Sequence, residues 1–246
     1  MSILITGGAK GIGRGIALRF ATPDNDVFIN YVNDDATAEA TAEEVEGKGA
    51  RAHLIKQDAS GPEGAQAIID RVREKVDVLD QLVHGAVRPC ASPALSIDPE
   101  DFRRSIDLNG SGLLYMVQAA RPLLRRGSTV YFLSSRGSYA VVPNYLAVGA
   151  GKALAECIVR YLAVELASDG IRINTVSCST VLTDAYRAAV GEGWEERAAL
   201  AAKNSPSGRN VTPEDVAATV EFLAGPGAEM INGQNIMLDG AYFLKT

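Results

Sequence analysis

The chain has 246 residues, 47% of them hydrophobic, and a formal net charge of −6 at pH 7. This size suits a single α/β domain with one core, and the acidic balance disfavours non-specific binding to nucleic acid. No apolar run is long enough to span a bilayer, and no basic leader precedes the first apolar segment, so we expect a cytoplasmic protein without membrane contacts.

The cysteines and histidines do not form a recognisable pattern. Cys90, Cys157 and Cys178 lack CxxC spacing and are odd in number, and His53 and His84 lie far apart without carboxylates nearby in the sequence. We therefore predict neither a disulfide framework nor a metal site.

Short apolar runs alternate along the chain with longer amphipathic stretches. The runs that predict strands are SILIT, DVFINYV, AHLIK, QLVHGA, STVYFLS, IRINTVS and QNIMLD. The stretches that predict helices are residues 12–21, 36–48, 64–75, 101–124, 145–167 and 212–223. Strands that alternate with helices predict a Rossmann fold in one domain, 1–246, with a doubly wound, mostly parallel seven-stranded sheet and helices on both faces.

The first strand is followed by TGGAKGIGRGIA, which opens a helix. Its glycines, Gly7, Gly11 and Gly13, permit positive φ and let backbone N–H groups approach a pyrophosphate at the positive end of the helix. At the first βα junction of a doubly wound fold, such a loop predicts a dinucleotide cofactor. We expect Lys10 and Ile12 to contact it together with the three glycines.

The second strand ends in INYVNDD, where a dinucleotide's adenosine ribose is expected. A carboxylate there would accept from the 2′-hydroxyl of NAD and repel the 2′-phosphate of NADP. Asn30 occupies this position, and Lys10 and Arg14 lie across the turn. These residues favour NADPH over NADH, although Asp34 and Asp35 oppose that preference.

The segment PNYLAVGAGKALAE carries a tyrosine and a lysine seven residues apart. Residues 144–166 have helical apolar spacing without an internal proline, which predicts one helix. Tyr145 and Lys152 would then share a face, about 10.5 Å apart along the axis. We interpret Lys152 as a cofactor contact and Tyr145 as a proton donor to the substrate; the alternative is a structural tyrosine and a solvated lysine.

The segment 184–212 lies between the sixth strand and the last helix. Residues 185–202 are helical in composition but interrupted by GEGW, and the turn-rich KNSPSGRNVT follows. Because ligands of open α/β sheets bind outside the carboxyl ends of the strands, we predict a substrate lid, with a plain surface excursion as the alternative.

The glycine loop, the tyrosine–lysine helix and the ending GQNIMLDG together resemble the short-chain dehydrogenase/reductase superfamily along essentially the whole chain. The resemblance implies that Lys152 holds the nicotinamide ribose and that its charge favours ionisation of the nearby phenol. The further residues that it implies are Ser135 and Asn109 in catalysis, and Asp58, Ala59, Gly85, Ala86, Val181 and Thr183 in cofactor binding.

The tyrosine–lysine spacing departs from most of that superfamily, in which the two residues are four apart. Four before Lys152 stands Val148, which has no proton to give, whereas Tyr145 is similar to the tyrosine of the NADPH-preferring bacterial enoyl-acyl-carrier-protein reductases. In conjugate reduction, hydride goes to the β-carbon and negative charge builds on an oxygen two atoms further away. A phenol one helical turn along suits that oxygen and would stabilise the enolate.

The leading hypothesis is an NADPH-dependent reductase of a conjugated carbon–carbon double bond, as in an enoyl thioester on an acyl-carrier protein. One alternative is a ketoreductase or alcohol dehydrogenase for cyclic or polyketide-like substrates. The other is a non-catalytic dinucleotide-binding member, which the altered segment HGAV and the pair Cys178-Ser179 keep open. His84 is interpreted as a packing residue. The resemblance also implies a homotetramer or dimer built on helices 101–124 and 145–167.

Overall fold

The protein is built around one sheet of parallel strands. The computed structural model describes residues 1–244. Its strands are β1 (Ser2–Thr6), β2 (Asp26–Tyr31), β3 (Arg51–Lys56), β4 (Gln81–His84), β5 (Thr129–Ser135), β6 (Arg172–Cys178) and β7 (Asn235–Leu238). They pair in the order β3-β2-β1-β4-β5-β6-β7, each pair parallel. The predicted Rossmann fold is confirmed, and these strands are all parallel rather than mostly so.

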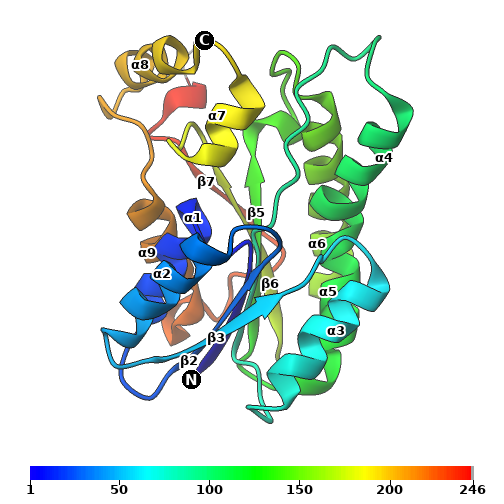
Figure 1. Ribbon diagram of the computed structural model, residues 1–246, viewed down its shortest axis with the longest axis vertical. Coiled ribbons are helices and arrows are strands. Elements are labelled where there is room, and N and C mark those ends of the chain that lie inside the picture. The colour runs from blue at the N-terminus through cyan, green and yellow to red at the C-terminus, as the bar shows by residue number, and fades with distance from the viewer. Residues whose placement is uncertain (245–246) are drawn as a thin grey trace.

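Helices cover both faces of this sheet, as Figure 1 shows. On one face lie α1 (Gly11–Phe20), α2 (Asp35–Glu46) and α9 (Pro213–Ala224); on the other lie α3 (Pro62–Arg73), α4 (Pro99–Ile106), α5 (Gly112–Ala120) and α6 (Leu146–Ala167). Two further helices, α7 (Asp184–Val190) and α8 (Trp194–Asn204), lie at the carboxyl end of the sheet. Short 3₁₀ turns are η2 (Arg121–Leu123), η3 (Arg136–Ser138), η4 (Pro226–Ala228) and η5 (Tyr242–Leu244).

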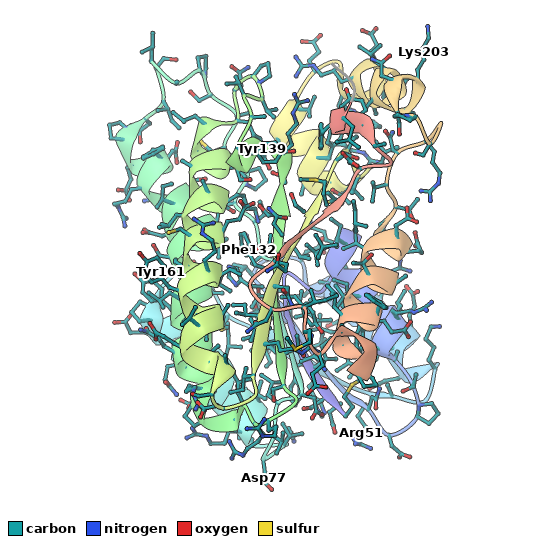
Figure 2. The ribbon with its side chains drawn as sticks, turned by 180° about the vertical axis from the view of Figure 1, so that it is seen from behind. Arg51, Asp77, Phe132, Tyr139, Tyr161 and Lys203 are labelled. Carbon is teal, nitrogen blue, oxygen red and sulfur yellow. The ribbon has the colours of Figure 1, made fainter. Side chains whose placement is uncertain are left out.

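The central strands are buried on both faces, as their near-continuous apolar sequences predict. In β5, successive side chains alternate between two core clusters: Tyr131 packs with α1 and α9, and Phe132 packs with α5 and α6. Figure 2 shows Phe132 in the interior and Tyr161 on the outer side of α6. Burial of each large side chain contributes about 1.5–3 kcal/mol, so this sheet is a rigid platform for the loops at its carboxyl end.

The helix predicted over 101–124 is interrupted. The structure has α4, then a π-helical turn, η1 (Asp107–Ser111), then α5 and η2. Here α6 approaches very closely, because a Cβ atom on Gly151 would lie 2.8 Å from the Cβ of Asn109, and one on Gly110 would lie 3.0 Å from the Gly151 carbonyl oxygen. The extra residue of a π turn is common near functional sites, and here it carries Asn109.

The prediction that Tyr145 lies within a helix is wrong. Asn144 has a φ of 60°, in the left-handed region, and follows Pro143, so the chain turns sharply before α6 begins at Leu146. Tyr145 is the N-cap residue, with φ −113° and ψ 8°, and its carbonyl accepts from the Gly149 N–H at 2.8 Å. The backbone of Tyr145 is therefore set by the turn before α6, and Tyr145 and Lys152 both line one cavity.

The order of the strands reverses beside β1. From β1 the chain builds outward through β2 and β3, then returns to place β4 on the other side of β1. Ligands of open α/β sheets bind at the carboxyl end of such a reversal, so the loops after β1 and β4 mark the place to look for a site. Within residues 1–244, no helix has both the length and the hydropathy needed to cross a membrane.

Candidate active site

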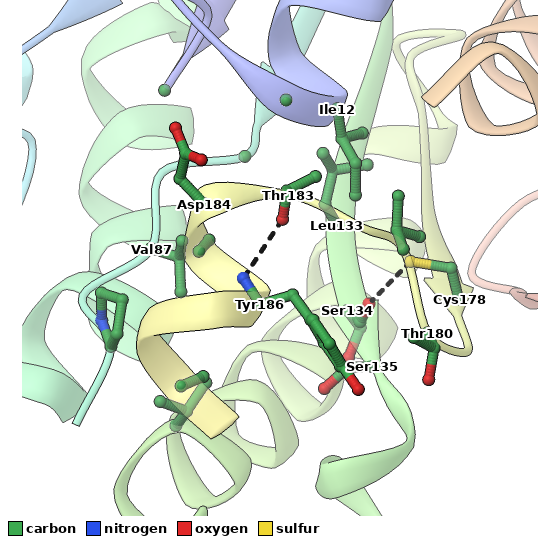
Figure 3. A pocket seen from close by; sticks show the side chains of 18 of the residues that line it. Ile12, Val87, Leu133, Ser134, Ser135, Cys178, Thr180, Thr183, Asp184 and Tyr186 are labelled. Carbon is green, nitrogen blue, oxygen red and sulfur yellow. Dashed lines mark hydrogen bonds between the residues drawn. The ribbon is translucent and has the colours of Figure 1, made fainter. Parts of the chain in front are cut away.

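A cavity of about 850 Å³ opens at the carboxyl end of the sheet. Figure 3 shows part of its lining, from the start of α1, the ends of β5 and β6, and α7. The predicted site residues that line it are Gly7, Lys10, Gly11, Ile12, Gly13, Asn30, Ala59, Gly85, Ala86, Ser135, Tyr145, Lys152, Val181 and Thr183. Asp58 and Asn109 are not part of the lining. The sequence thus located most of one continuous cavity.

The glycine loop is packed too closely for side chains. Gly7 has a φ of +70°, and a Cβ atom on it would lie 2.9 Å from the Ala86 Cα. On Gly13, a Cβ atom would lie 2.1 Å from the Gly7 carbonyl oxygen. Lys10 is the N-cap of α1, and no side chain caps this helix. The free N–H groups and the positive end of α1 face the cavity, so these residues fit a dinucleotide's phosphates.

The end of β2 differs from the expectation in one respect. Asn30 is buried, and its amide donates to the carbonyls of Ile55 at 3.1 Å and Gln57 at 2.8 Å, which fastens β2 to β3. Arg14, expected beside the cofactor, pairs with Glu44 at 2.5 Å and is outside the cavity lining.

Lys10, the other cation expected beside the cofactor, shares the cavity lining with Asn30. It lines the cavity 4.0 Å from the Asp34 carboxylate, which also lines it. Thus Lys10 is the candidate contact for a 2′-phosphate. The negative charge of Asp34 would repel that phosphate.

Tyr145 and Ser135 are brought together at the end of β5. The phenol oxygen lies 3.2 Å from the Ser135 Oγ. Burial raises the pKa of Tyr145 above its ordinary value, while the hydrogen bond from Ser135 opposes that rise. The phenol therefore keeps its proton at neutral pH, as a proton donor must.

Lys152 is buried and lines the same cavity as this pair. Its ammonium donates to the Leu133 carbonyl at 2.6 Å and lies 4.7 Å from the centre of the Phe132 ring. Burial lowers the pKa of Lys152 to about 8, and the charge of Lys152 is not among the causes that shift the pKa of Tyr145. The lowering of the phenol's pKa by Lys152 stays a prediction.

Asn109 lies in the interior rather than at the cavity. Its Oδ1 accepts from the Arg88 N–H at 3.0 Å, and its Nδ2 donates to the Arg88 carbonyl at 3.1 Å and to the Ser105 Oγ at 2.9 Å. This side chain fastens the loop after β4 to the π turn. Asp58, expected near adenine, is exposed and accepts from the Ser60 N–H at 2.9 Å, whereas its neighbour Ala59 lines the cavity.

His84 is fully buried and satisfied at both ring nitrogens. Its Nε2 lies 3.1 Å from the Leu108 carbonyl, which can only accept, so Nε2 carries the hydrogen. Its Nδ1 therefore accepts from the Thr6 hydroxyl at 3.2 Å, and the Thr6 oxygen in turn accepts from the N–H groups of Gly85 and Ala86. Burial lowers the pKa of His84 to about 4. The packing interpretation of His84 is confirmed, and its bonds fix the loop beneath the cavity.

The cavity also has a wall that the sequence did not point to. Tyr242 and Phe243 in the C-terminal turn η5 line it, and Phe243 lies under the Arg136 guanidinium at 4.6 Å. Tyr139 meets the edge of Phe243, with ring centres 6.4 Å apart. The sequence feature that could have indicated this wall is the aromatic pair Tyr242 and Phe243. The pair becomes informative only once the fold shows that η5 lies beside the cavity.

Cys178 and Tyr186 complete the lining at the carboxyl end of β6. The Cys178 Sγ lies 3.9 Å from the Ser134 carbonyl, and the Thr183 hydroxyl accepts from the Tyr186 N–H at 3.2 Å, as Figure 3 shows. Within residues 1–244, no group of three or more histidine, cysteine or acidic side chains is placed to hold a metal ion.

The fold and the cavity define a Rossmann-type oxidoreductase domain. The chain belongs to the short-chain dehydrogenase/reductase superfamily: residues 7–242 match the family model described as enoyl-(acyl carrier protein) reductase. The chain is 33% identical over 238 residues to the 1-cyclohexenylcarbonyl-CoA reductase of Streptomyces collinus, which covers 96% of this chain and 85% of that protein.

Two solved structures superpose closely on this one. A short-chain dehydrogenase from Burkholderia cenocepacia J2315 in complex with NADP has a TM-score of 0.89 and 28% identity, over 98% of this chain and 97% of that chain. The angucycline C-6 ketoreductase LanV with bound NADP has a TM-score of 0.89 and 26% identity, over 99% of this chain and 95% of that chain.

Proposed function

We propose that this protein binds NADP(H) and reduces a carbon–carbon double bond conjugated to a thioester carbonyl. The observation that carries the proposal is the Tyr145–Ser135 pair: a half-buried, protonated phenol 3.2 Å from a hydroxyl in the main cavity. Four residues before Lys152 the helix carries Val148, which has no exchangeable proton. Tyr145 is therefore the proton donor at this end of α6.

Some of the cavity residues would bind the dinucleotide, and others would bind the substrate. Bound NADPH would supply the hydride that reaches the β-carbon of the substrate. The start of α1 and its glycines would hold the pyrophosphate, Lys10 the 2′-phosphate, and Lys152 the nicotinamide ribose. Gly85, Ala86 and Val181, which line the cavity, would contact the nicotinamide.

At the substrate, Tyr145 would hold the thioester oxygen and stabilise the negative charge that develops there. Its Oη then gives a proton to the enolate oxygen, and the resulting enol tautomerises so that the hydrogen ends on the α-carbon of the saturated thioester. Ser135 would keep the phenol aimed at the cavity. Helices α7 and α8 would act as a lid that keeps water away from the reacting atoms.

The known relatives support this assignment. The matching family model is described as an enoyl reductase, and the Streptomyces relative is named for reduction of a cyclohexenyl thioester of coenzyme A. Both descriptions involve a double bond conjugated to a thioester. We propose an acyl-carrier protein or coenzyme A as the substrate's carrier on this ground.

Ketone reduction is the second candidate, because the ketoreductase LanV shares the fold at 26% identity. The same Tyr145 hydroxyl would then protonate the oxygen of the carbon that receives hydride. A panel of enoyl thioesters and cyclic ketones, each with NADPH and NADH, separates the two by loss of reduced-cofactor absorbance. We expect turnover of enoyl thioesters with NADPH, and turnover confined to ketones would replace the first proposal by the second.

The Tyr145→Phe substitution tests the proton donor. We expect it to lower kcat by about 10²–10⁴-fold, the usual contribution of a positioned general acid, and to leave the NADPH dissociation constant nearly unchanged. Tyr139→Phe is the matched control, because Tyr139 is 57% exposed and lies outside the cavity lining. Full turnover by Tyr145→Phe would show that Tyr145 is not the proton donor.

We also propose that the chain forms a dimer or tetramer, as the family resemblance implies. On the outer side of α6, Tyr161 is 69% exposed and Val164 is 79% exposed, which leaves apolar surface for a second copy of the chain. We expect light scattering to give a dimer or tetramer, and a monomeric mass would contradict this.

A further inference from the structure

The ammonium of Lys152 is buried without a close anion. Its residue is 5% exposed, and within residues 1–244 no carboxylate lies within ion-pair distance of it. The Leu133 carbonyl and the Phe132 ring are the partners that it has. A buried charge is costly unless other groups compensate it, so the source of that compensation decides whether Lys152 is charged.

One carboxylate is held near Lys152 by an unusual route. Glu156 lies one helical turn further along α6, a spacing that puts two side chains on the same face. Its Oε1 accepts from the Ser134 hydroxyl at 2.5 Å. Ser134 directly follows Leu133, whose carbonyl holds Lys152. Adjacent residues of β5 therefore bind the two groups: the Leu133 carbonyl accepts from the ammonium, and the Ser134 hydroxyl donates to the carboxylate.

The other groups that face Lys152 do not supply a negative charge at neutral pH. On β4, His84 is neutral, since burial lowers its pKa to about 4. On β6, burial raises the pKa of the Cys178 thiol to about 11. On η1, Asp107 is paired with Arg103 at 2.6 Å. The phenol of Tyr145 keeps its proton, because burial raises its pKa.

We propose that Glu156 is a positioning residue that supplies the counter-charge for the Lys152 ammonium, and that the Ser134 hydroxyl holds the Glu156 carboxylate in place for this role. The inference rests on the proposed contact of Lys152 with the nicotinamide ribose. It adds a pair of residues, from α6 and β5, that act on the cofactor through Lys152 without touching it.

The charge balance predicts the direction of the effect. Burial lowers the pKa of Lys152 to about 8, and Cys178 and then Glu156 act in the opposite direction. Because burial raises the pKa of the Cys178 thiol to about 11, the thiol is still protonated where Lys152 titrates, which leaves the Glu156 carboxylate as the negative charge. Without that charge, Lys152 loses its proton at a lower pH. Because a neutral amine holds the ribose hydroxyls less well, NADPH affinity should then fall at a lower pH than in the wild-type protein.

The test is the pH dependence of the NADPH dissociation constant, measured by fluorescence titration. For Glu156→Gln we expect the alkaline midpoint of the binding curve to move down by about one pH unit, with affinity near wild type on the acid side. Ser134→Ala should move it in the same direction by less. Glu165→Gln is the matched control, because Glu165 lies exposed on the same helix, and its midpoint should not move.

The outcomes separate cleanly. Glu156→Asp keeps the charge and should retain a midpoint close to wild type; a shift as large as that of Glu156→Gln would overturn the proposal. Unmoved midpoints in folded Glu156→Gln and Ser134→Ala would also overturn it, and if Glu156→Gln does not fold, Ser134→Ala decides alone. Since the readout is cofactor binding, a failure to turn over enoyl thioesters would refute the proposed function and leave this result standing.

Discussion

Helices α1 and α9 lie side by side on one face of the sheet but begin in opposite ways (Figure 1). They touch where a Cβ atom on Gly15 would lie 2.9 Å from the Pro213 Cβ. At the start of α9, the Thr212 Oγ1 accepts from the Asp215 N–H, and the Asp215 carboxylate accepts from the Thr212 N–H at 2.9 Å, a complete capping box. At the start of α1, Lys10 supplies no cap.

The difference shows which helix end is kept open for a ligand. Side-chain caps satisfy N–H groups that a helix leaves free, and each contributes about 1 kcal/mol. The N-terminus of α9 has that stabilisation, whereas the N-terminus of α1 lacks it and faces the cavity. The missing cap of α1 is therefore best explained if the phosphates of a bound dinucleotide accept hydrogen bonds from its first N–H groups.

Among substitutions at the starts of α1 and α9, we expect Gly13→Ala to have the largest effect on NADPH binding and stability. The new Cβ atom would lie 2.1 Å from the Gly7 carbonyl oxygen, so the glycine loop and α1 must move apart. We expect loss of NADPH binding by at least about 100-fold and a loss of about 1–3 kcal/mol in the free energy of unfolding. Fluorescence titration and urea denaturation measure the two.

The control for that substitution is Gly61→Ala. Gly61 is the N-cap of α3, and a Cβ atom there would have its nearest neighbour, the Glu63 carboxylate, at 3.6 Å. We expect both quantities to stay near wild type. Equal losses in the two variants would mean that glycine itself, and not the close approach at α1, is what the helix start requires.

The strands and the glycine loop were predictable because their signals are local. Alternating apolar runs and turn residues define β1 to β7, and the loop from Gly7 to Gly13 directly follows β1. The position of Tyr145 was not predictable, because it depends on the left-handed φ of Asn144, which helical periodicity does not reveal.

Features that depend on distant packing also escaped the sequence. The π turn at Asn109 arises where α6 approaches η1 through Gly151, and the side chain of Asn109 is then taken up by the Arg88 backbone. The C-terminal wall at Phe243 depends on Arg136, more than 100 residues earlier in the chain. Resemblance supplied a role for Asn109, but only the packing shows which groups its amide bonds.

The capped end of α9 should respond to pH through Asp215. The hydrogen bond from Arg209 is the main cause that lowers the pKa of Asp215 to about 2, below its ordinary 3.8. A carboxylate with a lowered pKa stabilises the fold above its ordinary pKa and loses that contribution as the pH falls toward the folded value. We expect Asp215→Asn to cost about 1 kcal/mol at neutral pH without changing NADPH affinity.

The pH series provides the check on that prediction. Urea denaturation of wild type and Asp215→Asn should give a constant difference in stability from neutral pH to about pH 4, and a shrinking one below it. Glu214→Gln is the control, because Glu214 lies exposed on the same turn of α9. A difference that persists unchanged toward pH 2 would show that the Asp215 charge is not its cause.

The smallest effect, and the sharpest test of the comparison, is to give α1 the cap that it lacks. Lys10 already has the extended backbone of an N-cap, with φ −152° and ψ 171°, so Lys10→Ser should place a hydroxyl on the free N–H groups. Lys10→Ala removes the same charge without adding a cap. Relative to Lys10→Ala, we expect Lys10→Ser to raise the unfolding free energy of the cofactor-free protein by about 1 kcal/mol and to weaken NADPH binding several-fold, because the hydroxyl competes with the pyrophosphate. Tighter binding by the serine variant would mean that the start of α1 is not where the phosphates lie.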